Sequence, residues 1–356
     1  MIEECGRLPA ARLFSGILFM KIKTRNRITI FVLVILLIFS MFLSLLLGRF
    51  EISIKECIGI LASKIIHIAP YWTNIQNNML WLVRVPRVAI AMLVGMALSV
   101  AGTSYQCIFR NPMAAPDILG ASTGAAFGAA YAILHNYSST TITIYAFAAS
   151  IICVTIVIFV SRICKGNPVV NLVLAGIMIG SLFSAATSYL KLIADPNNSL
   201  PAITYWMMGS LSGANMGQLS YVWLPMLIAI TPIIILRWKM NLLTIDDEEA
   251  KTMGINTGRI RTIIIISATL LTAASVSVSG MIGWVGLVIP HIARRLVGND
   301  CRILIPTAAL TGGIFLVVVD DFARSLYTTE LPLGVLTAFI GAPFFIYLMT
   351  RKGVSD

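Results

Sequence analysis

Charge is scarce in this sequence. Only 12% of its 356 residues are Asp, Glu, Lys or Arg, whereas 58% are apolar, and the mean hydropathy is +0.90. A water-soluble domain of this length needs more polar surface than that. Basic residues outnumber acidic ones by 26 to 15, but they lie in short loops between apolar runs, as the positive-inside rule describes. The composition therefore predicts a membrane protein in contact with lipid and excludes nucleic acid as a partner.

Motifs for metal binding and catalysis are also missing. The three histidines form no HxxxH or HExxH arrangement, and the six cysteines form no CxxC pair. No GxxxxGKS or GxxxxGKT sequence is present to cradle the phosphates of a nucleotide. We therefore expect no cofactor, no metal site, no disulfide and no catalytic residue in this chain.

The apolar runs lack ionisable residues at their centres, and Asp320 and Asp321 lie only at the outer end of one run. Ion-coupled carriers and intramembrane hydrolases keep charged or metal-binding side chains within the membrane, where such groups are costly and are retained for function. Their absence argues against both classes. Neutral polar side chains remain in the runs, and they either line a water-filled path or bond to their own helix. They are Ser99, Thr103, Ser104, Asn171, Ser181, Ser184 and Thr187.

Most apolar runs are about one membrane thickness long, since roughly 20 helical residues cross a hydrocarbon core of about 30 Å. The run 262–293 is longer, and we interpret it as a hairpin broken at Gly280, Gly283 and Gly286. With the N terminus inside, this hairpin places most Lys and Arg residues in the cytoplasm, whereas a single span would reduce that excess. The predicted spans are 28–47, 88–109, 118–134, 141–161, 168–190, 219–236, two within 262–293, 303–319 and 331–350.

These spans predict an all-α, polytopic bundle of about ten helices in the inner membrane, with both termini cytoplasmic. Residues 1–27 would form a cytoplasmic N-terminal segment, 28–350 one transmembrane domain and 351–356 a cytoplasmic tail. The first span lacks a signal-peptide cleavage site and should remain as an anchor. We expect translation to start at Met20, because a basic and then an apolar stretch follow it directly.

Glycines recur at intervals of four in two spans, as Gly120, Gly124 and Gly128 and again as Gly176 and Gly180. This spacing puts them on one helix face and lets neighbouring backbones approach closely. The pattern fits a tight bundle around a pathway and fits ordinary membrane packing equally well.

Two long segments carry a family resemblance. Residues 84–129 read RVPRVAIAMLVGMALSVAGTSYQCIFRNPMAAPDILGASTGAAFGA, and 283–349 contain GWVGLVIPHIARRLVGND, DDFAR and ELPLGVLTAFIGAPFFIYLM. Both resemble the permease family of type II ABC importers, which includes siderophore, haem and vitamin B12 permeases. The resemblance extends over nearly everything from residue 28 onward. It implies a vitamin B12 permease-like bundle of ten spans, so that 28–350 would be a single permease domain.

The resemblance also implies partners. They are two copies of an ABC ATPase subunit, an extracytoplasmic substrate-binding protein and a second permease copy or a paralogue. Arg84, Arg87 and Arg324 occupy the positions at which the family docks its binding protein through acidic residues. The alternative for these arginines is anchoring to lipid headgroups.

The loop 238–261 contains the stretch LLTIDDEEAKTMGINTG, which resembles the helix that couples such permeases to their ATPase. Its acidic residues would open a short helix beside the positive N-terminal dipole. The alternative is a merely solvated loop helix, and Asp246 departs from the glycine usual in the family. The coupling residues implied are Asp247, Glu248, Glu249, Ala250, Met253 and Gly254.

A cytoplasmic gate is implied at two places. Asn111 and Met113 belong to an NPM motif between the second and third spans, and Val169 and Val170 begin the fifth. The vitamin B12 permease has small hydroxyl residues at the second place, so the chain departs from it there.

The sequence thus predicts the permease subunit of an importer driven by a separate ATPase, with no enzymatic activity of its own. An iron-siderophore complex is the expected cargo, with haem or cobalamin as alternatives. An ion-coupled secondary transporter is the competing class.

Overall fold

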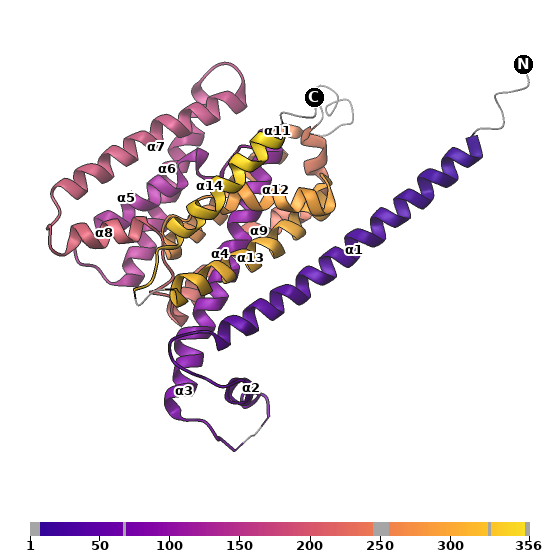
Figure 1. Cartoon of the computed structure of the whole chain (residues 1–356). Coiled ribbons are helices and arrows are strands. Elements are labelled where there is room, and N and C mark those ends of the chain that lie inside the picture. Colours follow the sequence, from indigo (N-terminus) through magenta and orange to yellow (C-terminus); the bar gives the residue numbers. More distant parts are fainter. Residues whose placement is uncertain (1–7, 67–68, 245–255, 327–328, 353–356) are drawn as a thin grey trace, which may run out of the picture.

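The computed structural model describes residues 8–66, 69–244, 256–326 and 329–352. Throughout these ranges the regular elements are helices (Figure 1). The longer ones are α1 (Leu8–Leu46), α4 (Val85–Ile108), α5 (Ala121–Leu134), α6 (Ser139–Ile163), α7 (Pro168–Leu192), α9 (Met216–Met240), α11 (Thr257–Ser279), α12 (Val285–Val297), α13 (Cys301–Ser325) and α14 (Leu333–Lys352).

Each predicted span overlaps one of these ten helices, although α1 begins well before residue 28 and α12 ends after residue 293. The all-α membrane bundle is confirmed. In the described part of the chain, seven stretches are long and apolar enough to cross a membrane, and α5 and α14 supply shorter apolar helices. The remaining helix, α12, is short and ends with Arg294 and Arg295 in its last turn.

The run 262–293 is broken near its middle, as predicted, and its two halves, α11 and α12, both pack on α4. Helix α11 ends at Ser279, and Gly280 follows with a φ of +65°, which a glycine adopts without steric cost. Trp284 also has a positive φ, and α12 begins at Val285. The break is therefore Gly280 to Trp284, whereas Gly286 lies inside the first turn of α12.

Helix α4 lies at the centre of the bundle and packs along α13, α11, α12 and α9. Glycines make this possible. A Cβ atom at Gly95 would overlap the carbonyl oxygen of Gly312 on α13, and one at Gly102 would overlap the carbonyl oxygen of Gly286 on α12. The central crossings thus bring backbones into contact, as small residues do in membrane helices.

A second group consists of α5, α6 and α7, which pack on one another. A Cβ atom at Gly124 or Gly128 would collide with α6, and one at Gly176 would collide with the backbone of Ile118. The expected close approach is confirmed at these three positions. At Gly180 the nearest atom, Oγ1 of Thr123, lies at an ordinary contact distance of 3.4 Å.

Short elements gather at one end of the bundle. Helices α2 (Ile54–Ala62) and α3 (Asn74–Asn78) lie beyond the point where α1 meets the start of α4, and a π-helical turn, η1 (Met79–Arg84), leads into α4. Helix α8 (Ser199–Met207) connects α7 to α9. Helix α1 packs on α13, and its N-terminal part extends well away from the bundle (Figure 1).

Most of the hydroxyl groups within the spans bond to their own helix. Thr103, Ser104, Ser181 and Thr187 each donate to the carbonyl oxygen four residues earlier. These four side chains therefore follow the alternative in which a hydroxyl group bonds to the backbone of its own helix. Asn171 donates to the carbonyl oxygen of Cys164, 3.0 Å away in the preceding loop.

Candidate functional site

The three arginines predicted to dock a binding protein lie together where α1 and α13 end and α4 begins. The guanidinium of Arg87 donates to both oxygens of Asp320, at 2.9 Å each, and to both oxygens of Glu330, at 2.8 and 3.0 Å. Two bidentate pairs therefore use one guanidinium, the geometry that makes such pairs strong. Asp320 is buried, whereas the Glu330 side chain is 26% exposed.

The other two arginines bond to the end of α1. Arg324 donates to the carbonyl oxygen of Ser44 at 2.6 Å and forms an ion pair with Asp321. Arg84 donates to the carbonyl oxygens of Leu45, at 2.6 Å, and Leu46, at 3.0 Å. These are carbonyls that the end of a helix leaves without helical partners.

The sequence reasoning treated these arginines as exposed, and this assumption is wrong. Arg84, Arg87 and Arg324 are 3%, 7% and 6% exposed, and each is occupied by partners within the chain. Arg87 and Arg324 face three carboxylates, those of Asp320, Asp321 and Glu330. Arg84 instead donates to backbone carbonyl oxygens. The docking role itself stays a prediction.

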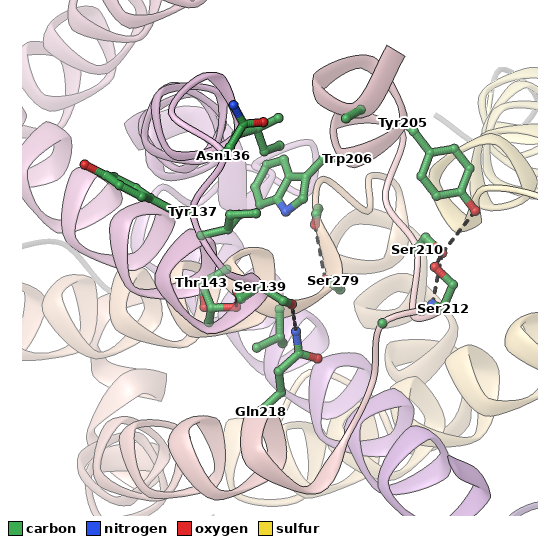
Figure 2. A pocket seen from close by; sticks show the side chains of 17 residues that line it. Asn136, Tyr137, Ser139, Thr143, Tyr205, Trp206, Ser210, Ser212, Gln218 and Ser279 are labelled. Atoms are coloured by element: carbon green, nitrogen blue, oxygen red, sulfur yellow. Dashed lines mark hydrogen bonds between the residues drawn. The ribbon is translucent and has the colours of Figure 1, made fainter. Parts of the chain in front are cut away.

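A cavity of about 460 Å³ lies between the α5–α6 turn, α8, the start of α9 and the end of α11 (Figure 2). Tyr137, Tyr205 and Trp206 contribute aromatic rings, and Figure 2 shows Ser210, Ser212 and Gln218 nearby. None of the described residues that line it is charged. The lining offers aromatic faces and neutral hydrogen-bonding groups, which suits an organic ligand.

Gln218 is a polar side chain of this cavity with an unused hydrogen-bond acceptor. It is 6% exposed, and its Nε2 donates to Oγ of Ser139 at 3.2 Å, while its Oε1 has no hydrogen-bond partner within the described part of the chain. Across the cavity, Tyr205 and Ser212 bond to Oγ of Ser210, and the Ser210 N–H donates to the carbonyl oxygen of Ser279 at 2.8 Å. A buried acceptor without a protein donor can accept a hydrogen bond from a ligand or a water molecule.

The predicted gate residues lie at the opposite end of α4. Asn111 and Met113 are exposed, and Oδ1 of Asn111 accepts the backbone N–H of Met113 at 2.8 Å. Val169 and Val170 form the first turn of α7, where Asn167 caps both N–H groups. Asn111 lines a cavity with Arg110 and Arg294, whereas Val169 lines a different one with Phe109. The two gate segments are thus at the same end of the bundle but line different cavities.

The predicted coupling residues, Asp247, Glu248, Glu249, Ala250, Met253 and Gly254, lie outside the described residues. The structure therefore leaves this prediction as it stood.

Sequence reasoning missed the internal partners of the arginines. Glu330 and Asp320 lie 243 and 233 residues from Arg87 along the chain, so no local pattern connects them. It also missed Gln218, which reads in the sequence as one polar residue near the start of a span. The available signal was a cluster of acidic residues beside Arg324, all at one predicted membrane boundary.

Comparisons with known proteins support this architecture. The model of the FecCD transport family matches residues 36–351. The molybdate import permease of Haemophilus influenzae is 35% identical over 92% of this chain and 97% of its own length. The hemin transport permease of Yersinia pestis is 38% identical, over 79% of this chain and 87% of its own. A solved structure described as an inward-facing ABC transporter of the metal-chelate type has a TM-score of 0.81 and 34% identity, covering 90% of this chain and 98% of its own. This chain therefore belongs to the FecCD transport family and is the membrane permease of an ABC importer.

Proposed function

We propose that this permease carries a ferric chelate, an iron-siderophore complex, across the cytoplasmic membrane. The observation that carries the proposal is the neutral cavity beside α8, whose described lining combines aromatic rings with hydroxyl and amide groups. The organic shell of a siderophore presents matching groups, because it wraps the metal in apolar and hydrogen-bonding atoms. The likeness to a hemin permease and to a metal-chelate transporter supports a chelated metal as cargo.

Molybdate is a second candidate, because the molybdate permease of Haemophilus influenzae matches nearly the whole chain. A small dianion is usually held by basic side chains or several N–H groups, and the described cavity lining contains no Lys or Arg. We therefore place molybdate second.

Uptake measurements separate the cargoes. Cells that lack this gene would be supplied in turn with a radiolabelled ferric siderophore, haem, cobalamin and molybdate, with and without the gene on a plasmid. We expect gene-dependent uptake of the ferric siderophore alone. Gene-dependent uptake of molybdate without uptake of iron would overturn the proposal in favour of the second candidate.

The working assembly contains two permeases, two ATPase subunits and one external binding protein. ATP-driven closure of the ATPases moves the coupling segments and switches the cargo path from outward to inward facing. In this scheme Asn111, Met113, Val169 and Val170 close the path on the cytoplasmic side, and Asp247 to Ala250, Met253 and Gly254 contact the ATPase. Uptake that persists without ATP while a proton gradient is maintained would indicate an ion-coupled carrier instead.

The orientation follows from the positive-inside rule and places both termini, the 245–255 loop and the gate residues in the cytoplasm. The arginine network and the cavity beside α8 then face outward. Accessibility tags test this directly. A tag after Asp356 or within 246–256 should be cytoplasmic and one at Asn197 external, and an external C-terminal tag would contradict the ten-span topology.

Docking at Arg84, Arg87 and Arg324 then requires carboxylates of the binding protein to replace partners that the arginines have within the chain. Because each arginine already has partners inside the chain, a carboxylate of the binding protein reaches Arg87 by replacing Glu330, whose side chain is partly exposed. Asp320 stays in place beneath it and keeps the guanidinium oriented. The exchange swaps one ion pair for another, so its strength rests on several contacts and on shape, since a single exposed pair contributes only about 0.2–1 kcal/mol.

A further inference from the structure

Two cysteines lie in contact where α4 ends and α13 begins. Sγ of Cys107 is 3.3 Å from Sγ of Cys301, and the residues are 194 positions apart in the chain. A disulfide bond is about 2.05 Å long, so the two sulfurs need to approach by only about 1.3 Å to be joined.

The backbone around Cys301 is held firmly. Its N–H donates to Oδ1 of Asn241 at 2.8 Å, and Nδ2 of Asn241 donates to Oδ1 of Asp300 at 2.7 Å. Asp300 also caps α13 through the N–H of Arg302. On the other side, α4 and α13 touch through Gly95 and Gly312, so neither helix can move far from the other.

Small molecules from solvent can reach the pair. Both sulfurs belong to residues that line a cavity of about 640 Å³, together with Gln106, Arg110 and Arg294. Cys107 is 7% exposed and Cys301 is 1% exposed, so Cys107 is the more accessible thiol. One carboxylate, that of Asp300, lines the cavity beside the two arginines, so the described ionisable lining keeps an excess of basic side chains. Partly open surroundings with basic side chains are typical of cysteines that react with oxidants.

The other described cysteines lack this arrangement. Cys57 and Cys153 are buried elsewhere in the bundle, and Cys164 is exposed in the loop before α7. Within the described part of the chain, the Cys107–Cys301 contact is thus the one place where two thiols are positioned to join.

We propose that Cys107 and Cys301 form an oxidant-sensitive disulfide that ties α4 to α13 beside Asn111. In a reducing cytosol the two residues are thiols. A peroxide oxidises them, and a small thiol such as glutathione restores them. This inference concerns the packing of α4 against α13 and does not depend on the cargo or the partners.

The reaction proceeds in two balanced steps. The thiolate of Cys107 attacks one oxygen of hydrogen peroxide, the O–O bond breaks, and the departing hydroxide takes a proton to become water, which leaves a sulfenic acid. The thiolate of Cys301 then attacks the sulfenic sulfur, the S–S bond forms and a second water leaves. Two thiols lose two electrons, and one peroxide is reduced to two waters.

The disulfide would act on the end of α4 that carries the predicted gate. Asn111 lies four residues after Cys107, in the turn that follows the end of α4 at Ile108, and lines the same cavity. With α4 fixed to the first residue of α13, this turn loses the freedom to shift against α13. The oxidised form is therefore expected to be the more stable and the less mobile of the two.

Peptide mapping of the full-length protein in lipid nanodiscs tests the proposal. The protein is reduced, freed of reductant, treated with hydrogen peroxide, alkylated and digested without reduction. We expect a linked peptide pair containing Cys107 and Cys301, formed several-fold faster than any loss of free thiol at Cys57 or Cys153. Thermal unfolding of the oxidised protein should be several degrees higher and should return to the starting value after reduction.

Variants identify the source of each effect. Cys164→Ser, the matched control, should leave the linked pair and the rise in unfolding temperature unchanged. Cys301→Ser should abolish both and leave a sulfenic or sulfinic acid at Cys107. The peptide map of the oxidised wild-type protein is sufficient to test the proposal, so the test does not depend on whether a variant folds well. Oxidation that gives only acids at Cys107, or only links through Cys164 between molecules, would overturn the proposal.

Discussion

Helices α4, α11 and α13 differ from α1, α7 and α9 in how much of each span the protein itself covers. Within an 18-residue window, 72%, 78% and 56% of the residues are buried in the first three spans, against 22% in each of the others. All six are long and apolar enough to cross a membrane. Hydropathy therefore identifies spans without revealing which of them the bundle encloses.

Small residues let the central helices approach one another closely. The buried helices meet through glycine, alanine and hydroxyl residues, such as Gly95, Gly102 and Ser99 on α4. The outer helices expose large aliphatic side chains, such as Leu182 on α7 and Leu227 and Ile235 on α9. Lipid tails are as apolar as these side chains, so burial inside the protein gains little hydrophobic energy and close packing decides which helices form the centre.

The strongest way to break this comparison is to enlarge a small residue at the centre. Gly102→Val should cost about 3 kcal/mol or prevent stable folding, because the new side chain overlaps the carbonyl oxygen of Gly286 on α12. Ala185→Val on α7 is the matched control, since Ala185 is exposed. Thermal unfolding of the purified protein measures both. Equal effects of the two changes would mean that the central crossing is looser than the structure indicates.

The charged end of the central helices should give the next largest effect. Asp320→Ala leaves Arg87 and Arg324 without their shared buried carboxylate, and breaking such a pair costs about 3–5 kcal/mol. Glu330→Ala should cost less than about 1 kcal/mol, because its partly exposed side chain is screened by water. Replacing Arg87 with Met and Asp320 with Leu together should recover part of the loss. A double variant as unstable as Asp320→Ala would show that the pair is required by shape and not only by charge.

The spans could be predicted from the sequence because length, apolar composition and loop charge report directly on the membrane. The break after Ser279 was also predictable, since the run was too long for one helix and contained a glycine cluster, and Gly280 indeed adopts a positive φ. Contacts between distant residues were not. The pairing of Arg87 with Glu330 depends on how the end of α13 packs beside α4, and no local period encodes that.

The same limit explains the error over the arginines. Their position at a predicted membrane boundary suggested exposure, because long charged side chains usually reach for water there. Here backbone carbonyls at the end of α1 and the carboxylates of α13 supply the partners that water would otherwise provide. The cavity beside α8 was likewise beyond the sequence, since four separate segments meet to form it.

A smaller effect should appear in docking, where Glu330 occupies Arg87 on the predicted external face. Glu330→Gln removes the competing charge, so an acidic binding protein should bind the reconstituted transporter several-fold more tightly and with a steeper salt dependence. Glu51→Gln, which removes a charge from the loop between α1 and α2, controls for general electrostatic attraction. Affinity that falls in Glu330→Gln would show that Glu330 shapes the docking surface and does not compete for it. Affinity that rises equally in both variants would leave Arg87 without a specific role.

The smallest effect is expected at α2, which packs at the end of α1, away from the centre of the bundle. Its N terminus carries a capping box in which Ser53 accepts the N–H of Glu56 and the Glu56 carboxylate accepts the N–H of Ser53, at 2.8 Å. This bond, followed by one with the Gln76 side chain, lowers the pKa of Glu56 from its ordinary value of 4.5. A lowered pKa in the folded state means that the stabilisation is present above about pH 4.5 and disappears as the pH falls through the folded-state pKa.

Amide hydrogen exchange measures this effect. In the wild type, after correction for the intrinsic pH dependence of exchange, the amides of α2 should lose protection as the pH falls. Glu56→Gln keeps the acceptor but cannot titrate, so its protection should not change with pH, while α4 stays protected in both proteins. A pH dependence that survives in Glu56→Gln would place the titrating group elsewhere.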